Sequence, residues 1–172
     1  DENNESSTQK EAIGTSWHSY PSIYTLGHKA IVNLFDGPIV VQEKIDGSQF
    51  NFGRFGDELR FKSKEAIIQE TEPPKMFKKA VDYVISIKDK LRDGWTYRGE
   101  VLNKPKHNAL AYSRVPKHNI ILFDINIGEE NYYPVFGLSG EAGLLDLEVV
   151  PCFMMTETMV NLDVLNSWLE LD

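Results

Sequence analysis

The feature that most constrains the fold is an alternation of polar and apolar residues that begins at Ser48. Phe50 and Phe52 alternate with polar neighbours, as in a strand with one buried and one solvated face. Residues 53–57 then predict a turn, and residues 59–62 predict a returning strand. We therefore expect a β-hairpin within an antiparallel sheet that covers an apolar core on one side.

Other segments predict helices and further strands around this hairpin. A helix is predicted after Pro73 and Pro74, because apolar residues from Met76 to Ile87 recur at helical spacing and Gly94 marks an end. Further strands are predicted at residues 39–44, 95–98, 119–125 and 148–150, and short helices at 139–146, capped by Ser139, and at 161–170. The expected fold class is α+β, with antiparallel β-sheets flanked by helices.

The length of 172 residues predicts about one domain. Residues 1–16 are polar and rich in acids, so we expect a flexible tail before a globular part at residues 17–172. No apolar run of about 18 residues occurs, and the first residues do not have the pattern of a signal peptide, so no membrane contact is expected. The single cysteine, Cys152, cannot form an internal disulfide. An intracellular setting, cytoplasmic or nuclear, is therefore expected.

The net charge of −8 is unevenly distributed along the chain. Such an acidic balance disfavours a general nucleic-acid coat protein, because these proteins usually neutralise phosphates with a basic face. Most of the basic residues, however, lie between residues 60 and 118, and residues 126–172 contain no lysine or arginine. The central part of the chain is therefore compatible with a local phosphate-binding surface.

The strongest chemical signal is the run from Glu43 to Ser48, Glu-Lys-Ile-Asp-Gly-Ser. Lys44 follows an apolar strand and precedes a glycine turn. Desolvation or nearby cations lower the pKa of such a lysine and make its neutral amine available as a nucleophile. A charged hairpin turn explains the same residues, since Asp-Gly is a common turn pair. On these residues alone the turn is the better interpretation.

Three further segments favour a nucleotide site in combination. Ser63 and Lys64 pair a hydroxyl with a cation, although lysines also guard exposed edge strands. Gly99 permits close approach of a ligand to the backbone, and Glu100 beside it can accept two ribose hydroxyls. Phe123 lies in an apolar strand, where it packs in the core or stacks on a purine. Each segment alone has a structural explanation, but their order along the chain favours nucleotide binding.

Together these segments resemble the nucleotidyltransferase domain shared by ATP-dependent DNA ligases, RNA ligases and mRNA capping enzymes. Residues 44–47 match its first motif, Lys-x-Asp-Gly, and residues 98–100 match its third, with Phe123 and Asp124 in the strand motif that follows. Residues 26–29, 103–117 and 147–151 resemble the RNA ligase 2 type branch, and the similarity spans residues 17–172. The resemblance implies an ATP-grasp-like ligase domain.

The resemblance also implies a reaction and a set of site residues. An ATP-dependent RNA ligase with Mg²⁺ would form lysyl-AMP, transfer AMP to an RNA 5′-phosphate and seal RNA ends or a nicked RNA duplex with a 3′-hydroxyl. The implied catalytic residue is Lys44. The implied nucleotide-binding residues are Glu43 near the adenine edge, Ile45, Asp46, Gly47, Lys64, Glu100 on the ribose and Phe123 on the purine. Candidates for RNA or phosphate contacts are Arg98, Lys104, Lys106 and His107, for which a solvated basic loop is the alternative.

Two departures from the family pattern limit this prediction. Lys64 stands where the family usually has arginine, which keeps the charge but loses the bidentate fork. The fourth motif, a Glu-Gly strand that helps bind metal, does not occur in the sequence. The fifth motif, a Lys-x-Lys that follows it in the family, is missing as well, because residues 126–172 contain no lysine or arginine. We therefore expect the N-terminal portion of the domain and assign no metal ligand. The alternatives are a non-catalytic fragment that binds ATP, AMP or an RNA end, and a DNA ligase or guanylyltransferase.

Overall fold

The computed structural model describes residues 16–106 and 110–156, and the backbone alone for residues 153–156. The chain divides into two compact units. The first contains Asp1–Tyr20 and Ile45–Val149, and the second contains Pro21–Lys44 and Val150–Asp172. The predicted helix at 161–170 and the predicted tail, except its last residue, lie outside the described residues.

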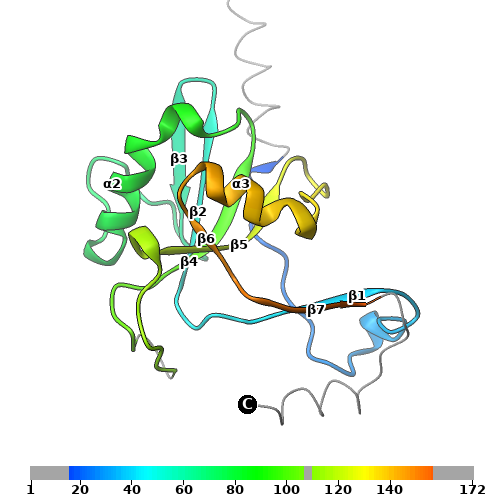
Figure 1. Ribbon diagram of the computed structural model, residues 1–172. Helices are drawn as coiled ribbons and strands as arrows, with labels where there is room; N and C mark the ends of the chain where they lie inside the picture. Colours follow the sequence, from blue (N-terminus) through cyan, green and yellow to red (C-terminus); the bar gives the residue numbers. More distant parts are fainter. Residues whose placement is uncertain (1–15, 107–109, 157–172) are drawn as a thin grey trace, which may run out of the picture. The chain divides into compact units, whose positions relative to one another are not determined.

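The first unit is built on a five-stranded sheet of order β3-β2-β4-β5-β6, as Figure 1 shows. Its strands are β2 (Ser48–Phe55), β3 (Glu58–Lys62), β4 (Thr96–Val101), β5 (Ile120–Asn126) and β6 (Glu148–Val149). All neighbouring pairs are antiparallel except β5 and β6, which are parallel. The α+β class and the hairpin of β2 and β3 are therefore confirmed.

The turn of this hairpin is shorter than predicted. Strand β2 continues through Gly53 and Arg54 to Phe55, so only Gly56 and Asp57 connect it to β3. Gly56 has a φ of +66°, a conformation that glycine adopts without strain. The prediction of a turn over residues 53–57 was wrong because Gly53 is a paired residue within β2. A side chain at Gly53 would collide with the backbone carbonyl of Trp95.

The predicted helix after the two prolines is confirmed, in three consecutive pieces. They are η2 (Lys75–Phe77), α2 (Lys78–Ser86) and η3 (Lys88–Lys90). The second predicted helix is preceded by η5 (Val135–Gly137) and forms α3 (Leu138–Leu144). Its N-cap is Gly137, with no side-chain cap bond, so the prediction of Ser139 as cap was wrong. A further short turn, η4 (Lys117–Asn119), precedes β5.

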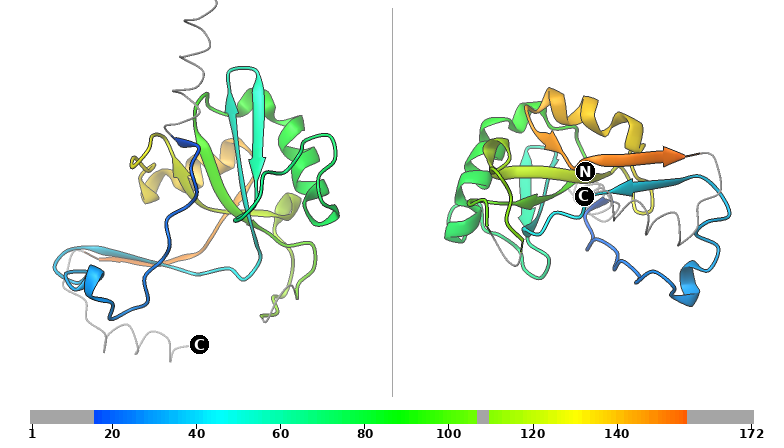
Figure 2. Two further views of the ribbon diagram at one scale, coloured as in Figure 1. Left: turned by 180° about the vertical axis from the view of Figure 1, so that it is seen from behind. Right: turned by 60° about the horizontal axis from the view of Figure 1, so that its bottom comes forward.

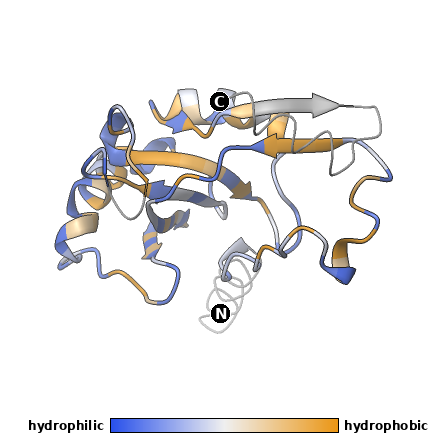
Figure 3. Cartoon of the chain, turned by 90° about the horizontal axis from the view of Figure 1, so that it is seen from below, coloured by the Kyte–Doolittle hydropathy of each residue, from blue (hydrophilic) through white to orange (hydrophobic). Residues whose placement is uncertain are grey.

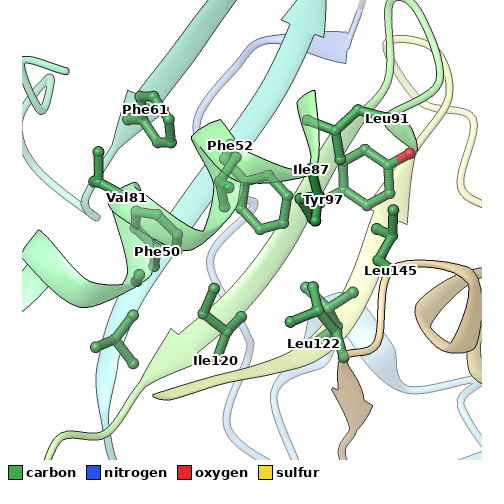
Figure 4. Close-up of a cluster of buried hydrophobic side chains, with 14 of the residues drawn as sticks. Phe50, Phe52, Phe61, Val81, Ile87, Leu91, Tyr97, Ile120, Leu122 and Leu145 are labelled. Atoms are coloured by element: carbon green, nitrogen blue, oxygen red, sulfur yellow. The ribbon is translucent and has the colours of Figure 1, made fainter. Parts of the chain in front are cut away.

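Residues of α2 and α3 belong to the same buried cluster as one face of the sheet (Figure 4). Phe50 and Phe52 of β2 are fully buried, and Phe52 stacks on Tyr97 with ring centroids 5.2 Å apart. Val81 of α2 and Leu122 of β5 are also fully buried in this cluster. Burial of each such side chain stabilises the fold by about 1.5–3 kcal/mol. The other face of the sheet is thereby left for polar residues.

The second unit contains a two-stranded antiparallel sheet of β1 (Ile39–Gln42) and β7 (Cys152–Thr156). Strand β1 is mainly hydrophobic, as Figure 3 shows. The short turn η1 (Lys29–Ile31) is capped by His28, whose Nδ1 accepts a hydrogen bond from the Ala30 amide at 3.0 Å. Strand β1 ends before Glu43, earlier than predicted, and β7 was not predicted.

Candidate functional site

A row of polar side chains crosses the face of the large sheet that is opposite the core. Cross-strand pairing places Asn51 of β2 between Lys62 of β3 and Arg98 of β4. Arg98 in turn lies opposite Asp124 of β5. We call these four residues the polar row. They alternate with buried residues such as Phe52, and successive strand side chains point to opposite faces, so the row faces away from the core.

Glu100, the expected ribose ligand, lies on the same face as the polar row. It lies two residues beyond Arg98 on β4, opposite Gln49 of β2 and Ile121 of β5. The neighbouring Gly99 brings two strands together, because a Cβ there would lie 2.6 Å from the carbonyl oxygen of Ile121. The structure therefore gives this glycine a role in pairing β4 with β5. The ribose contact of Glu100 remains a prediction.

Arg98, expected to contact phosphate or RNA, is fully buried in the described structure. Its guanidinium donates to Asn126 Oδ1 at 3.0 Å, to Asn51 Oδ1 at 3.2 Å and to the backbone oxygen of Ser16 at 3.1 Å. Burial lowers the pKa of Arg98 to about 10. A phosphate can reach this group only if some of these protein contacts are displaced. The observed role of Arg98 is to join three strands and the N-terminal segment.

The N-terminal segment, residues 16–20, covers the polar row (Figure 2, left, dark blue). Ser16 is buried, and its hydroxyl donates to the carbonyl oxygen of Gly94 at 2.6 Å. The Nζ of Lys62 lies 4.7 Å from the centre of the Trp17 ring, and the Arg98 guanidinium lies 5.8 Å from the centre of the Tyr20 ring. The segment therefore spans the row from β3 to β5.

Tyr20 fixes the β5 end of the polar row, and the sequence did not predict this role. Its hydroxyl donates to Asp124 Oδ2 at 2.7 Å, and its ring meets that of Phe123 edge-on with centroids 5.1 Å apart. Burial, and then the bond to Asp124, raises the pKa of Tyr20. Burial also raises the pKa of Asp124, although the bond from Tyr20 opposes this shift. No sequence motif pointed to Tyr20, which precedes Pro21 in an irregular segment.

Phe123, the expected purine-stacking residue, lies at a β-bulge. Arg98 pairs with Asp124 and Gly99 with Leu122, so Phe123 has no partner on β4. Bulges bend a strand locally and redirect side chains. Phe123 is half-buried rather than part of the closed core, and its described aromatic neighbour is Tyr20. This placement is compatible with stacking on a purine, which remains a prediction.

Lys44 and Glu43 belong to the second unit. The Glu43 amide donates to the carbonyl oxygen of Pro151 at 3.0 Å, which extends the pairing of β1 with β7 by one bond. Lys44 is exposed. Ile45, the next residue, already belongs to the first unit. The first motif therefore spans the junction of the units, and the nucleophilic role of Lys44 remains a prediction.

Asp46 and Gly47 follow in the first unit, just before β2. The Asp46 amide donates to the Tyr112 hydroxyl oxygen at 2.7 Å, and its carboxylate accepts from the Leu110 amide at 3.1 Å. A Cβ at Gly47 would lie 2.8 Å from the carbonyl oxygen of Val101. These contacts hold the loop that contains Tyr112 against the first motif. The Asp46 carboxylate and the absence of a side chain at Gly47 therefore have structural roles that do not depend on a nucleotide.

The remaining expected contacts lie in loops. Lys64 is exposed after β3, in a turn where the Ser63 hydroxyl oxygen accepts from the Ala66 amide at 3.1 Å. Lys104 and Lys106 are exposed, and His107 lies outside the described residues. The structure does not bring the described members of this set onto the polar row. Their proposed contacts with nucleotide or RNA remain predictions.

The described residues do not form a metal site of the usual composition. Across residues 16–106 and 110–156, no three histidine, cysteine or acidic side chains come close enough together to hold an ion. We therefore assign no residues to Mg²⁺. In the same ranges, no helix has the length and apolar character that spanning a bilayer requires.

Comparisons with known proteins identify a family from a sequence model and a shared fold from solved structures. A family model for RNA ligases matches residues 37–170. A putative ATP-dependent DNA ligase from Aquifex aeolicus is 14% identical, with a TM-score of 0.61, over 89% of this chain and 42% of that one. An archaeal ATP-dependent RNA ligase is 14% identical, with a TM-score of 0.59, over 82% of this chain and 38% of that one.

A mutant RNA ligase from Naegleria gruberi with AMP and Mn gives a similar match. It is 16% identical, with a TM-score of 0.60, over 86% of this chain and 47% of that one. This chain thus spans about half or less of the solved chains that it matches. No curated protein sequence matches it.

Proposed function

This chain belongs to the RNA ligase family, and from that premise we propose that it forms the adenosine-binding part of an ATP-dependent RNA ligase. The observation that carries the proposal is the polar face of the large sheet. There the expected ribose ligand Glu100 lies on β4, and the expected purine-stacking residue Phe123 lies on the adjacent β5. Relatives of known structure hold ATP or AMP, which supports a nucleotide as the ligand.

The first chemical step of the proposal takes place at Lys44. Its neutral amine attacks the α-phosphorus of ATP, so that an N–P bond forms. The bond from this phosphorus to the oxygen shared with the β-phosphate breaks, and pyrophosphate leaves with the electron pair. The amine proton passes to solvent. Lys44 is exposed at the end of the first segment of the second unit, which is compatible with a role for its amine as a nucleophile.

Two transfers complete the proposed reaction. The 5′-phosphate of RNA attacks the phosphorus of lysyl-AMP, which releases Lys44 and forms an adenylylated RNA end. A 3′-hydroxyl then attacks the 5′-phosphate, forms the phosphodiester bond and releases AMP. The basic residues Lys104, Lys106 and His107 are the proposed contacts for RNA. Since the chain spans about half the length of its matched relatives, both transfers remain proposals for the whole enzyme.

The test is covalent labelling with ATP that carries a radioactive α-phosphate. We expect a weak labelled band on a denaturing gel, because residues 126–172, where the phosphate-binding fifth motif of the family would follow, contain no lysine. The band should disappear in Lys44→Ala and persist in Lys90→Ala, a matched control at an exposed lysine of η3. A band that survives in Lys44→Ala would refute the assignment of the nucleophile.

A second candidate, a domain that binds nucleotide without chemistry, predicts a different pattern. Calorimetry would then show AMP or ATP binding, while no labelled band forms in the wild type. Absence of both binding and label would contradict both candidates. The similarity to a DNA ligase favours a further comparison, of nicked RNA with nicked DNA as acceptors for AMP.

A further inference from the structure

Lys62 is a half-buried cation without an acidic partner among the residues that the structure describes. Its ammonium lies over the Trp17 ring at 4.7 Å, and the described ion pairs do not include it. Other lysines do have such partners, as Lys78 has in Asp82 at 2.9 Å. A desolvated charge without a counterion is costly, so this position is suited to receive an anion.

The charges that surround Lys62 make an anion at this position still more favourable. Asn51, its neighbour across β2, is neutral, and the next member of the polar row is the cation Arg98. Asp124 lies at the far end of the row, where it accepts from Tyr20. Burial and then the repulsion from Arg98 lower the pKa of Lys62 to about 8. In the part of the chain that the structure describes, Lys62 and Arg98 are therefore two neighbouring cations on one face, and no ion pair joins an acidic side chain to Lys62.

The position of Lys62 relative to the expected nucleotide is also favourable. Glu100 lies on β4 on the same face, and β2 separates β4 from the strand that carries Lys62. Two strand spacings across the sheet and two residues along the strands separate the two positions by about 12 Å. A flexible lysine and the sugar–phosphate part of a nucleotide can bridge this distance together. Lys64, by contrast, is exposed in the turn beyond β3.

We propose that Lys62 binds a phosphate group of the nucleotide whose ribose Glu100 holds. This inference rests on the proposed function, and it assigns a phosphate contact to Lys62, whereas the family pattern places its nucleotide-binding cation at residue 64. The indole of Trp17 then keeps the ammonium on the polar face in the free protein. A bound phosphate gives Lys62 the acidic partner that it does not have among the described residues.

The test measures ATP and adenosine binding by calorimetry in the wild type, Lys62→Met and Lys62→Arg. Lys79→Met is the matched control, since Lys79 is exposed on α2 and its loss changes the net charge equally. We expect Lys62→Met to weaken ATP binding by about tenfold or more, as for loss of a charge-assisted hydrogen bond. Adenosine binding, and ATP binding by Lys79→Met, should not change.

The pH dependence gives a second measurement. ATP affinity of the wild type should fall as the pH rises through about 8, where free Lys62 loses its proton. Lys62→Arg should abolish this decline, because an arginine keeps its charge there.

Four outcomes would overturn the inference. Equal ATP binding by the wild type and Lys62→Met would overturn it and leave the proposed function intact. Equal loss of ATP and adenosine binding would show a structural effect instead. Weaker binding of 5′-phosphorylated RNA alone would assign the contact to RNA. Failure of the wild type to bind ATP would overturn the proposed function as well.

Discussion

The bond between Tyr20 and Asp124 gives the sharpest test of the polar row as a structural unit. Tyr20→Phe removes the hydroxyl that donates to Asp124 Oδ2 at 2.7 Å but keeps the ring against Phe123. A hydrogen bond to a charged group contributes about 1.5–3 kcal/mol. Because both side chains are only partly buried, we expect the lower end, about 1.5 kcal/mol. For a chain of this size that corresponds to a loss of roughly 3–6 °C in Tm.

The pH dependence of this loss follows from the carboxyl group. Burial raises the pKa of Asp124 in the folded protein, while the bond from Tyr20 stabilises the charged form and opposes that shift. Tyr20→Phe therefore raises the Asp124 pKa further. The variant should be most destabilised at neutral pH, where Asp124 is ionised. Its loss of stability relative to the wild type should shrink as the pH falls through the Asp124 pKa, because a protonated carboxyl gains less from the hydrogen bond of Tyr20 than the charged form does.

The assay is chemical denaturation followed by circular dichroism, from about pH 7 toward about pH 4. Tyr24→Phe is the matched control, since Tyr24 is exposed and lies in the second unit. The control should unfold like the wild type at every pH. The reasoning would be refuted if Tyr20→Phe had the same free energy of unfolding as the wild type at neutral pH. A difference that stays constant as Asp124 becomes protonated would refute it as well.

Two further predictions concern strand pairing and acid stability. Gly99→Ala should destabilise the protein by about 2 kcal/mol or more, because the added Cβ would lie 2.6 Å from the Ile121 carbonyl oxygen. Gly140→Ala in α3 should instead stabilise it by about 0.5–1 kcal/mol, because a Cβ there would have no atom within 4 Å. Urea denaturation of both variants measures this difference. The hydrogen bond from His118 lowers the pKa of Asp146, so this carboxylate stabilises the fold above its unfolded-state pKa and loses that effect as the pH falls through its folded pKa. Asp146→Asn should therefore reduce stability at neutral pH and flatten its acid dependence, and an unchanged slope in acid would contradict this.

Local patterns predicted strands of the large sheet because the alternation of polar and apolar residues lies within single strands. Phe50 and Phe52 alternate with polar residues, and that period of two both defines β2 and separates the core face from the polar face. The same logic failed at Gly53, whose role depends on the distant carbonyl of Trp95. It also failed at Ser139, because α3 begins one turn earlier through η5 without a side-chain cap.

The site could be predicted only in part, for a related reason. Motifs pointed to Glu100 and Phe123, and the structure places them on adjacent strands of one sheet. No local pattern indicated that Arg98 is buried, since its neighbours in the chain do not reveal Asn51, Asn126 and Ser16 as partners. Long-range contacts of this kind become visible only when the register of the strands is known.

The N-terminal segment imposes an order on how this protein is made. During synthesis residues 16–20 leave the ribosome before the strands that they contact. Arg98 follows its partner Ser16 by 82 positions, and Asp124 follows its partner Tyr20 by 104 positions. Trp17 can contact Phe55 and Lys62 once β2 and β3 have been synthesised, but Tyr20 lacks its partner Asp124 until β5 has followed. Complete docking of this segment therefore cannot precede the synthesis of β5. The fluorescence of Trp17, which packs between Phe55 and the Lys62 ammonium, offers a natural reporter of that step.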